Sequence, residues 1–560
     1  MTVLLLATSG RRPRRTWRGA ALACLAAILS ATACGTGAPR PVGRGATPSV
    51  RALAVPAPGA LTVAGDTNRD GVVTTLDLEG RGSWSWRGRG AFCLANVDDD
   101  DADGRVDGTT DQVDGAGDEP DLAPVKVWLP TGARGGRLRL VPRASSAQAP
   151  AVRLHERTAE GWRPVRAPVA VTREVLEFGL EVAGFAGPGW DGILRVEAEW
   201  VAPDGRVTQR DLATWRVAPF LLLPNAARTR TLYVATGHPR YENLAFREGL
   251  GAACADTGVQ LVTHTTRSWK EMWMQDTMEV GYTQLPGLPP MHVVLGGLRG
   301  ADTFPPRLLG RDVGFIQVGR NRGIADGVDD WADWMGNLEV TPPVPGYPLG
   351  RVFYGRNTDT GVGLHPDVVA FLEAQRVQAP FWLDTGFLTI KHVDEIATFL
   401  PGTDGRPVLL IADTRRAVEL IPAEAGPSNT RNQARLDKVL GGGSYVDGTR
   451  SRGLQAELEL AADQIVRLPV SYEGGHNVWS NPVNSIWLNG VVVTGSHRVP
   501  APVATDLEAR FRGAGARAVR FVDDAAYQDN MGNVHCATNT RRAPVVADFS
   551  RVLPRVSGLE

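Results

Sequence analysis

The sequence is poor in lysine, in cysteine and in net charge. Only four of its 60 basic residues are lysines, and the formal net charge at pH 7 is −1. Without an excess of positive charge, the chain gives no electrostatic reason to bind nucleic acid. Five cysteines in 560 residues exclude a disulfide-based scaffold, although a bridge between Cys93 and Cys254 stays open. The length exceeds what one hydrophobic core normally serves, which predicts two or more domains.

Long hydrophobic runs are missing as well, and the run near the N-terminus is short. Five arginines between residues 11 and 18 precede an apolar run over residues 20–28, and small residues follow. This order is typical of a bacterial export signal, and the run is too short for a membrane-spanning helix. We predict an export signal over residues 1–34 and a protein that is extracellular or anchored to the outer face of the bacterial cytoplasmic membrane. Cys34 is the candidate acceptor of a lipid anchor, and ordinary cleavage is the alternative.

The rest of the chain divides by composition into three parts. Residues 35–60 are rich in Gly, Pro, Ala, Arg and Thr and have no hydrophobic periodicity, which predicts a flexible linker. Residues 61–217 contain short strand-like runs separated by turn residues, which favours an antiparallel β-sandwich. Residues 218–560 alternate strand-like and helical stretches, as an α/β domain does.

Two acidic loops in the predicted sandwich have the spacing of calcium ligands. Oxygen-bearing side chains recur at alternate positions, a glycine follows for the sharp turn, and a carboxylate closes each loop. The candidate ligands are Asp66, Asn68, Asp70 and Asp77 in one loop and Asp99, Asp101, Asp103 and Asp107 in the other. Carboxylates crowded this densely repel one another unless a cation lies between them. A solvated acidic loop is the alternative.

Three distant segments of the α/β part hold residues suited to chemistry on a guanidinium group. Cys536 lies among small and polar residues with no second cysteine near it, which favours a nucleophile. Asp276 and Asp394 can hold the N–H groups of a planar cation. His392 lies two residues before Asp394, so in an extended segment both side chains would share a face. Together the segments predict a deiminase.

At these segments the sequence resembles the protein-arginine deiminase family. The matching segments occur in the family's order and run over about residues 217–560. They are Trp273-Met274-Gln275-Asp276, Gly336-Asn337-Leu338-Glu339, Tyr347-Pro348-Leu349-Gly350-Arg351, Val377-Gln378-Ala379-Pro380, His392-Val393-Asp394-Glu395 and Val534-His535-Cys536. Weaker similarity extends upstream to the family's middle domain, whereas the additional N-terminal domain of the vertebrate enzymes has no counterpart here.

The resemblance implies a fold and a mechanism. The fold is an immunoglobulin-like sandwich followed by a five-bladed α/β propeller of the pentein or amidinotransferase type. In the implied mechanism, Cys536 attacks the guanidinium carbon and His392 protonates departing ammonia. Asp276 and Asp394 orient the substrate, and water hydrolyses a covalent thiouronium intermediate to citrulline.

The resemblance also implies a calcium requirement and groups that present the substrate. One calcium site would use the side chains of Gln275, Glu279 and Glu339 and the carbonyls of Met335 and Leu338. A second family site has lost its side-chain ligands, at Thr277 and over residues 296–301, and we expect it to be absent.

Two residues are candidates for substrate binding. Arg299 is expected to grip the substrate backbone and Trp273 to pack along the arginine stem, although a core role for Trp273 is an alternative. Arg320 and Arg322, which resemble the substrate-binding loop, are expected to form a surface turn. The expected activity is therefore calcium-dependent conversion of arginine in proteins or peptides to citrulline. A deiminase of free arginine or agmatine and an inactive calcium-binding surface module are the alternatives.

Overall fold

The computed structural model describes residues 59–560 apart from 111, 114, 134, 172, 239–241, 267, 300–302, 321–329, 557–558 and 560. The predicted export signal, Cys34, nearly all of the predicted linker and Arg322 therefore lie outside the described residues. Across the part of the chain that is described, no helix has both the length and the apolar character that crossing a bilayer requires.

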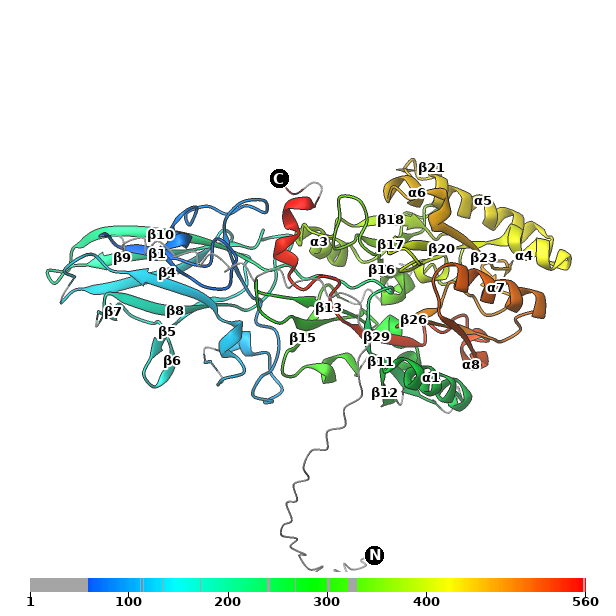
Figure 1. Cartoon of the computed structure of the whole chain (residues 1–560), viewed down its shortest axis with the longest axis horizontal. Helices are drawn as coiled ribbons and strands as arrows, with labels where there is room; N and C mark the ends of the chain where they lie inside the picture. Colours follow the sequence, from blue (N-terminus) through cyan, green and yellow to red (C-terminus); the bar gives the residue numbers. More distant parts are fainter. Residues whose placement is uncertain are drawn as a thin grey trace, which may run out of the picture. The chain divides into compact units, whose positions relative to one another are not determined.

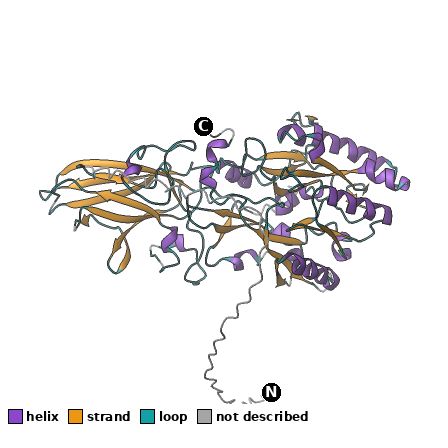
Figure 2. Ribbon diagram, in the orientation of Figure 1, coloured by secondary structure: helices purple, strands orange, loops and turns teal. Residues whose placement is uncertain are grey.

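Two five-stranded sheets form the first part of the described chain (Figures 1 and 2). One sheet has the order β1-β3-β8-β5-β6, with the bounds Thr62–Ala64, Ala123–Trp128, Val175–Val182, Val152–Thr158 and Gly161–Pro164. The other has the order β2-β10-β9-β4-β7, with the bounds Ala91–Cys93, Val207–Val217, Ile193–Val201, Arg137–Ala144 and Val169–Ala170. Pairing is antiparallel except between β2 and β10.

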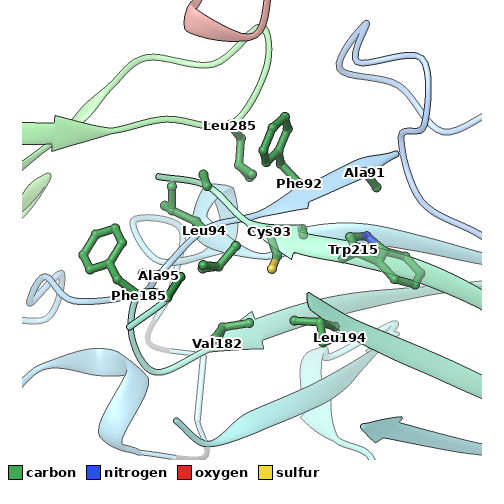
Figure 3. Packing of buried hydrophobic residues seen from close by; sticks show 14 of the residues in the cluster. Ala91, Phe92, Cys93, Leu94, Ala95, Val182, Phe185, Leu194, Trp215 and Leu285 are labelled. Carbon is green, nitrogen blue, oxygen red and sulfur yellow. The ribbon is translucent and has the colours of Figure 1, made fainter. Parts of the chain in front are cut away.

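Alternating side chains bury one face of each of these sheets. Along β9, Leu194, Val196, Ala198 and Trp200 are buried, as expected for a strand whose residues point to opposite faces in turn. The sulfur of Cys93 lies in the same core, among Val182, Leu194 and Trp215 (Figure 3). Cys93 and Cys254 are both free thiols, so the disulfide left open by the sequence does not form in this structure.

Within the described residues, the second part of the chain contains five three-stranded sheets with one shared topology. In each, the middle strand pairs antiparallel with one neighbour and parallel with the other. In the order antiparallel neighbour, middle strand, parallel neighbour, the sheets are β29-β11-β12 (Thr538–Arg542, Thr229–Thr236, Gln260–Thr265), β13-β14-β15 (Met278–Thr283, Met291–Gly296, Val313–Gln317), β16-β17-β18 (Leu338–Val340, Val352–Arg356, Phe381–Asp384), β19-β20-β23 (Ala397–Leu400, Val408–Asp413, Ile465–Pro469) and β26-β27-β28 (Ile486–Leu488, Val491–Gly495, Ala518–Val522). The sequence alone showed no such repeat.

Helices connect the middle strand of most sheets to its parallel neighbour, because a parallel connection needs a crossover. These helices are α1 (Leu244–Thr257), α3 (Pro366–Ala374), α4 (Thr414–Leu420) with α5 (Pro427–Gly441), and α7 (Ala501–Gly513). Gly258 ends α1 in the left-handed conformation, with a φ of 65°. The short helices α2 (Met274–Thr277), α6 (Leu454–Glu457) and α8 (Ala525–Gln528) and the hairpins β21-β22 (Gly443–Ser444, Arg450–Ser451) and β24-β25 (Tyr472–Glu473, His476–Asn477) complete this part.

The strands of the five-stranded sheets lie between residues 62 and 217, and those of the three-stranded sheets lie between residues 229 and 542. The domain boundaries drawn from composition stay a prediction.

Candidate active site

The predicted catalytic residues come from corresponding places in different three-stranded sheets. Cys536 lies two residues before β29, Asp276 two residues before β13, and Asp394 three residues before β19. His392 caps the short 3₁₀ turn Val393–Glu395 that leads into β19. One structural position, repeated from sheet to sheet, therefore delivers side chains from segments that are far apart in the sequence.

The structure brings these four side chains into two contacts around one cavity. The Cys536 thiol donates to Oδ2 of Asp394 at 3.4 Å. Nδ1 of His392 lies 3.5 Å from Oδ1 of Asp276, while its Nε2 lies 2.8 Å from the carbonyl oxygen of Trp331. Since a carbonyl only accepts, Nε2 carries a proton, and Nδ1 is the ring nitrogen left for proton exchange.

A small cavity of about 80 Å³ lies beside both pairs, and of the four residues only Asp394 does not line it. Cys536, His392 and Asp276 line it, together with four tryptophans: Trp269, Trp273, Trp331 and Trp334. Such walls exclude water from a bound planar cation and offer it aromatic faces. The ring of Trp273 packs against Gly532, in the turn before Cys536. A Cβ added at Gly532 would lie only 2.3 Å from this ring. The ring thus belongs to the cavity wall, where the sequence expected it to meet the substrate.

Burial and negative charge keep the resting thiol protonated. Burial raises the pKa of the Cys536 thiol well above its ordinary value, and the neighbouring Asp394 and Asp276 raise it further. Burial also raises the pKa of Asp276, against the opposing effect of His392 and Arg299. A cation bound between these carboxylates would cancel their effect on the sulfur and favour the thiolate. The site is therefore suited to a nucleophile that ionises when a positively charged substrate arrives.

Arg299 is buried behind two of the tryptophans that line the cavity, Trp273 and Trp334. Its side chain is 1% exposed and donates a hydrogen bond to the carbonyl of Trp273 at 3.1 Å. Its guanidinium group lies 3.9 Å from the carboxylate of Asp276. The same group stacks 4.5 Å from the centre of the Trp334 ring. A grip on the substrate backbone would require this side chain to move outward. The described Arg320, by contrast, is exposed, as a surface turn requires.

The residues of the expected calcium site gather next to the Cys536 segment. Nε2 of Gln275 donates to Glu279 at 2.6 Å, and Glu339 lies 3.1 Å from Nε2 of His535. Burial and the charge of Glu339 raise the pKa of Glu279 to about 8, and burial raises the pKa of Glu339 to about 7. Two buried carboxylates that repel each other are hard oxygen donors suited to a divalent cation. The backbone amide of the nearby Leu338 donates to the carbonyl of Met335, so this short turn is closed by its own hydrogen bond.

The comparisons with known proteins name the family. The model of the protein-arginine deiminase family matches residues 207–440. Human protein-arginine deiminase type-4 is 26% identical over 431 residues, which is 68% of this chain and 63% of that protein. The mouse type-4 protein is 26% identical over 563 residues, 88% of this chain and 83% of that protein. Over residues 207–440 the chain is therefore similar to the protein-arginine deiminase family.

Solved structures with some similarity are more distant. An agmatine deiminase of C. jejuni is 9% identical and covers 58% of this chain and 96% of its own, with a TM-score of 0.36. The agmatine deiminase of Enterococcus faecalis is 12% identical and covers 58% of this chain and 97% of its own, with a TM-score of 0.37.

Both acidic loops of the sandwich fold in the same way. The first aspartate of each loop, Asp66 or Asp99, accepts the backbone amides four and five residues later. The fourth residue of each, Arg69 or Ala102, has a positive φ of 61°. Oxygens of Asp99, Asp101 and Asp107 lie within 4.8 Å of one another, as do those of Asp100, Asp118 and Asp121. The remaining predicted ligands, Asn68, Asp70, Asp77 and Asp103, lie in the same two loops.

Two residues beside the nucleophile were missed by the sequence analysis. His535 places Nδ1 2.9 Å from Oδ2 of Asp394 and Nε2 3.1 Å from Glu339, so its ring joins the expected calcium ligands to the cavity. Against the effect of burial, these carboxylates raise its pKa to about 9. Asn484 contacts both Asp394 and Cys536. His535 could have been suspected from its place next to Cys536, whereas Asn484 has no such signal.

Proposed function

We propose that this protein is a calcium-dependent hydrolase that converts arginine in proteins or peptides to citrulline and ammonia. The observation that carries the proposal is the meeting of Cys536 with Asp394, and of His392 with Asp276, around one tryptophan-lined cavity. Two carboxylates, a thiol and an imidazole are the groups that opening a guanidinium needs. Similarity to the protein-arginine deiminase family supports the same reaction.

The chemistry would run in two halves at the guanidinium carbon. Asp276 and Asp394 hold the cation, and the Cys536 thiolate forms a C–S bond to the central carbon. A terminal C–N bond breaks, and the leaving nitrogen takes a proton from Nδ1 of His392 and departs as ammonia. Water then gives a proton to Nδ1 and attacks the carbon of the resulting thiouronium. The C–S bond breaks and the hydroxyl on the carbon gives its proton to solvent, which leaves citrulline and restores the thiolate.

Calcium is assigned to two places in this proposal. Gln275, Glu279 and Glu339, with the carbonyls of Met335 and Leu338, would hold one ion beside the Cys536 segment. The two acidic loops of the sandwich would hold others. A bound divalent cation would neutralise the buried carboxylates and fix the segments that carry them.

The finer features of fold and location belong to the same proposal. The shared topology of the five three-stranded sheets supports a five-bladed propeller of the pentein type, and the two five-stranded sheets support an immunoglobulin-like middle domain. The arginine-rich, apolar N-terminal pattern supports export, with Cys34 as the site of a lipid anchor.

The deciding experiment measures citrulline formed from a blocked arginine peptide, from free arginine and from agmatine, each with calcium and with a chelator. Wild-type protein should act on the peptide in calcium, and Cys536→Ala should be inactive. Activity that survives Cys536→Ala would refute the mechanism. Activity confined to free arginine or agmatine would refute the substrate class, and equal activity in chelator would refute the calcium requirement. A wild-type protein that binds calcium without forming citrulline would favour the inactive module.

A further inference from the structure

The repeated topology singles out one more residue at the active site. In four of the five three-stranded sheets, the residue two or three positions before the antiparallel neighbour strand is Cys536, Asp276, Gly336 or Asp394. Gly336 adjoins the site too, since a Cβ added there would lie 2.6 Å from Nδ1 of His392. In the fifth sheet the corresponding residue is Asn484, two positions before β26.

The side chain of Asn484 is 1% exposed and its three hydrogen bonds all go to site residues. Its Nδ2 donates to Oδ2 of Asp394 at 2.9 Å and to Sγ of Cys536 at 3.0 Å. Its Oδ1 accepts the backbone amide of Cys536 at 3.1 Å. The backbone carbonyl of Asn484 also accepts the amide of His535 at 3.1 Å. One amide group thus connects the nucleophile, its backbone and the substrate-binding carboxylate.

These partners leave the Asn484 amide only one orientation. The backbone N–H of Cys536 can only donate, so the atom that faces it must be the oxygen. The two hydrogens of Nδ2 then point at the carboxylate of Asp394 and at the sulfur. A hydrogen bond to a charged acceptor is stronger than one to a neutral acceptor, so the bond to sulfur gains most when the thiol ionises.

We propose that Asn484 is a positioning residue that holds the Cys536 sulfur beside Asp394 and stabilises it as a thiolate through an N–H donor. This inference rests on the proposed function. Asp394 accepts from the same Nδ2 that faces the sulfur, so one amide sets the spacing between the thiol and this carboxylate. The Asn484 donor points directly at the sulfur and is in place before the substrate arrives.

Asn481, three residues earlier, provides a matched control. It is also buried, and it ties the same segment to its neighbours by bonds to the backbone. Its Nδ2 donates to the carbonyl of Glu395 at 2.8 Å, and its Oδ1 accepts the amide of Val483 at 3.0 Å. A purely structural role for Asn484 predicts that substitutions at the two asparagines have the same consequences.

The test measures the pH dependence of Cys536 alkylation by iodoacetamide in the full chain, read by peptide mass mapping so that the other cysteines do not interfere. We compare wild type with Asn484→Ala, Asn484→Asp and Asn481→Ala. Asn484→Asp is isosteric and still accepts the Cys536 amide, but it cannot donate and adds negative charge. The alkylation pKa should rise by about one unit in Asn484→Ala and by more in Asn484→Asp. Asn481→Ala should leave it unchanged, even where it lowers the melting temperature.

Steady-state kinetics supply the second readout. Asn484→Ala should lower kcat by roughly 100-fold, as removal of one preorganised donor typically does, with KM changed little. An Asn484→Ala protein whose alkylation profile matches wild type would overturn the inference. So would equal shifts in Asn484→Ala and Asn481→Ala. Alkylation needs no substrate, so the two proposals can fail separately. If the alkylation pKa values of the variants follow the expected order but the protein forms no citrulline, the role of Asn484 is upheld and only the proposed function is refuted.

Discussion

Replacing Glu271 by glutamine tests the electrostatics of the segment that leads into the active site. Glu271 is 2% exposed. Its Oε1 accepts the amide and the hydroxyl of Thr303 at 2.5 and 2.7 Å and the amide of Phe304 at 3.2 Å. Its Oε2 accepts from the Thr266 hydroxyl and lies 3.3 Å from Nε2 of His264. Burial opposes ionisation, but these hydrogen bonds outweigh it and lower the pKa of Glu271 to about 2.

The size of the effect follows from that shift. A fall from the ordinary 4.5 to about 2 corresponds to about 3 kcal/mol of folding free energy at neutral pH. The glutamine oxygen can still accept from some of these donors, which reduces the expected loss to about 2 kcal/mol. Because the folded-state pKa is depressed, the stabilisation is complete above pH 4.5 and is lost as the pH falls from 4.5 towards 2. Glutamine also turns an N–H group towards one of these donors.

The assay is urea unfolding followed by tryptophan fluorescence between pH 7 and pH 3. Glu271→Gln should be about 2 kcal/mol less stable than wild type at pH 7, and the difference should shrink below pH 4.5. Glu197→Gln is the control, since Glu197 pairs with Arg143 in a half-exposed salt bridge and should contribute less than about 1 kcal/mol. A Glu271→Gln protein as stable as wild type at pH 7, or a difference that stays constant to pH 3, would refute this reasoning.

Three further predictions concern the site and its ions. Gly336→Ala would place a Cβ 2.6 Å from Nδ1 of His392 and 2.8 Å from Asp276. This close contact should lower kcat/KM by about 100-fold. In the control, Gly426→Ala, the atom nearest to the added Cβ is 3.9 Å away, and kcat/KM should not change. Glu339→Gln should weaken calcium binding at least about tenfold in isothermal titration calorimetry, and unchanged affinity would reject this ligand. Asp99→Asn should remove one calcium ion from the stoichiometry measured by native mass spectrometry, whereas a wild-type count would contradict an ion in that loop.

The predicted catalytic residues could be named from the sequence, but the repeated topology that brings them together could not. Cys536, Asp276 and Asp394 were recognised because each lies in a distinctive motif. The positions that correspond to them hold glycine at 336 and asparagine at 484. The five positions hold four kinds of residue and leave no periodic signal, because each sheet keeps its hydrogen-bond pattern whichever residue precedes its strand. Asn484 was missed for this reason.

Side-chain burial accounts for what else the sequence analysis could not reach. Arg299 was expected to grip the substrate backbone, and a buried arginine is rare without partners. Here the Asp276 carboxylate, the Trp273 carbonyl and the Trp334 ring supply those partners. All three belong to other segments of the chain. A single sequence shows the charge of Arg299 but not the three groups that make its burial tolerable.

The position of the nucleophile depends on contacts between the two ends of the α/β part. Strand β29, which begins two residues after Cys536, pairs antiparallel with β11, so the last strand of the repeat completes the first sheet. Asn539 in β29 donates to Oε1 of Gln275 at 3.1 Å and to the carbonyl of Met278 at 2.8 Å. These bonds tie the Cys536 segment to an expected calcium ligand 264 positions away. Closing so long a loop costs conformational entropy that local contacts cannot offset. The Cys536 thiol therefore reaches Asp394 through pairing between strands from the two ends of this part of the chain, so residues far apart in the sequence meet at one site.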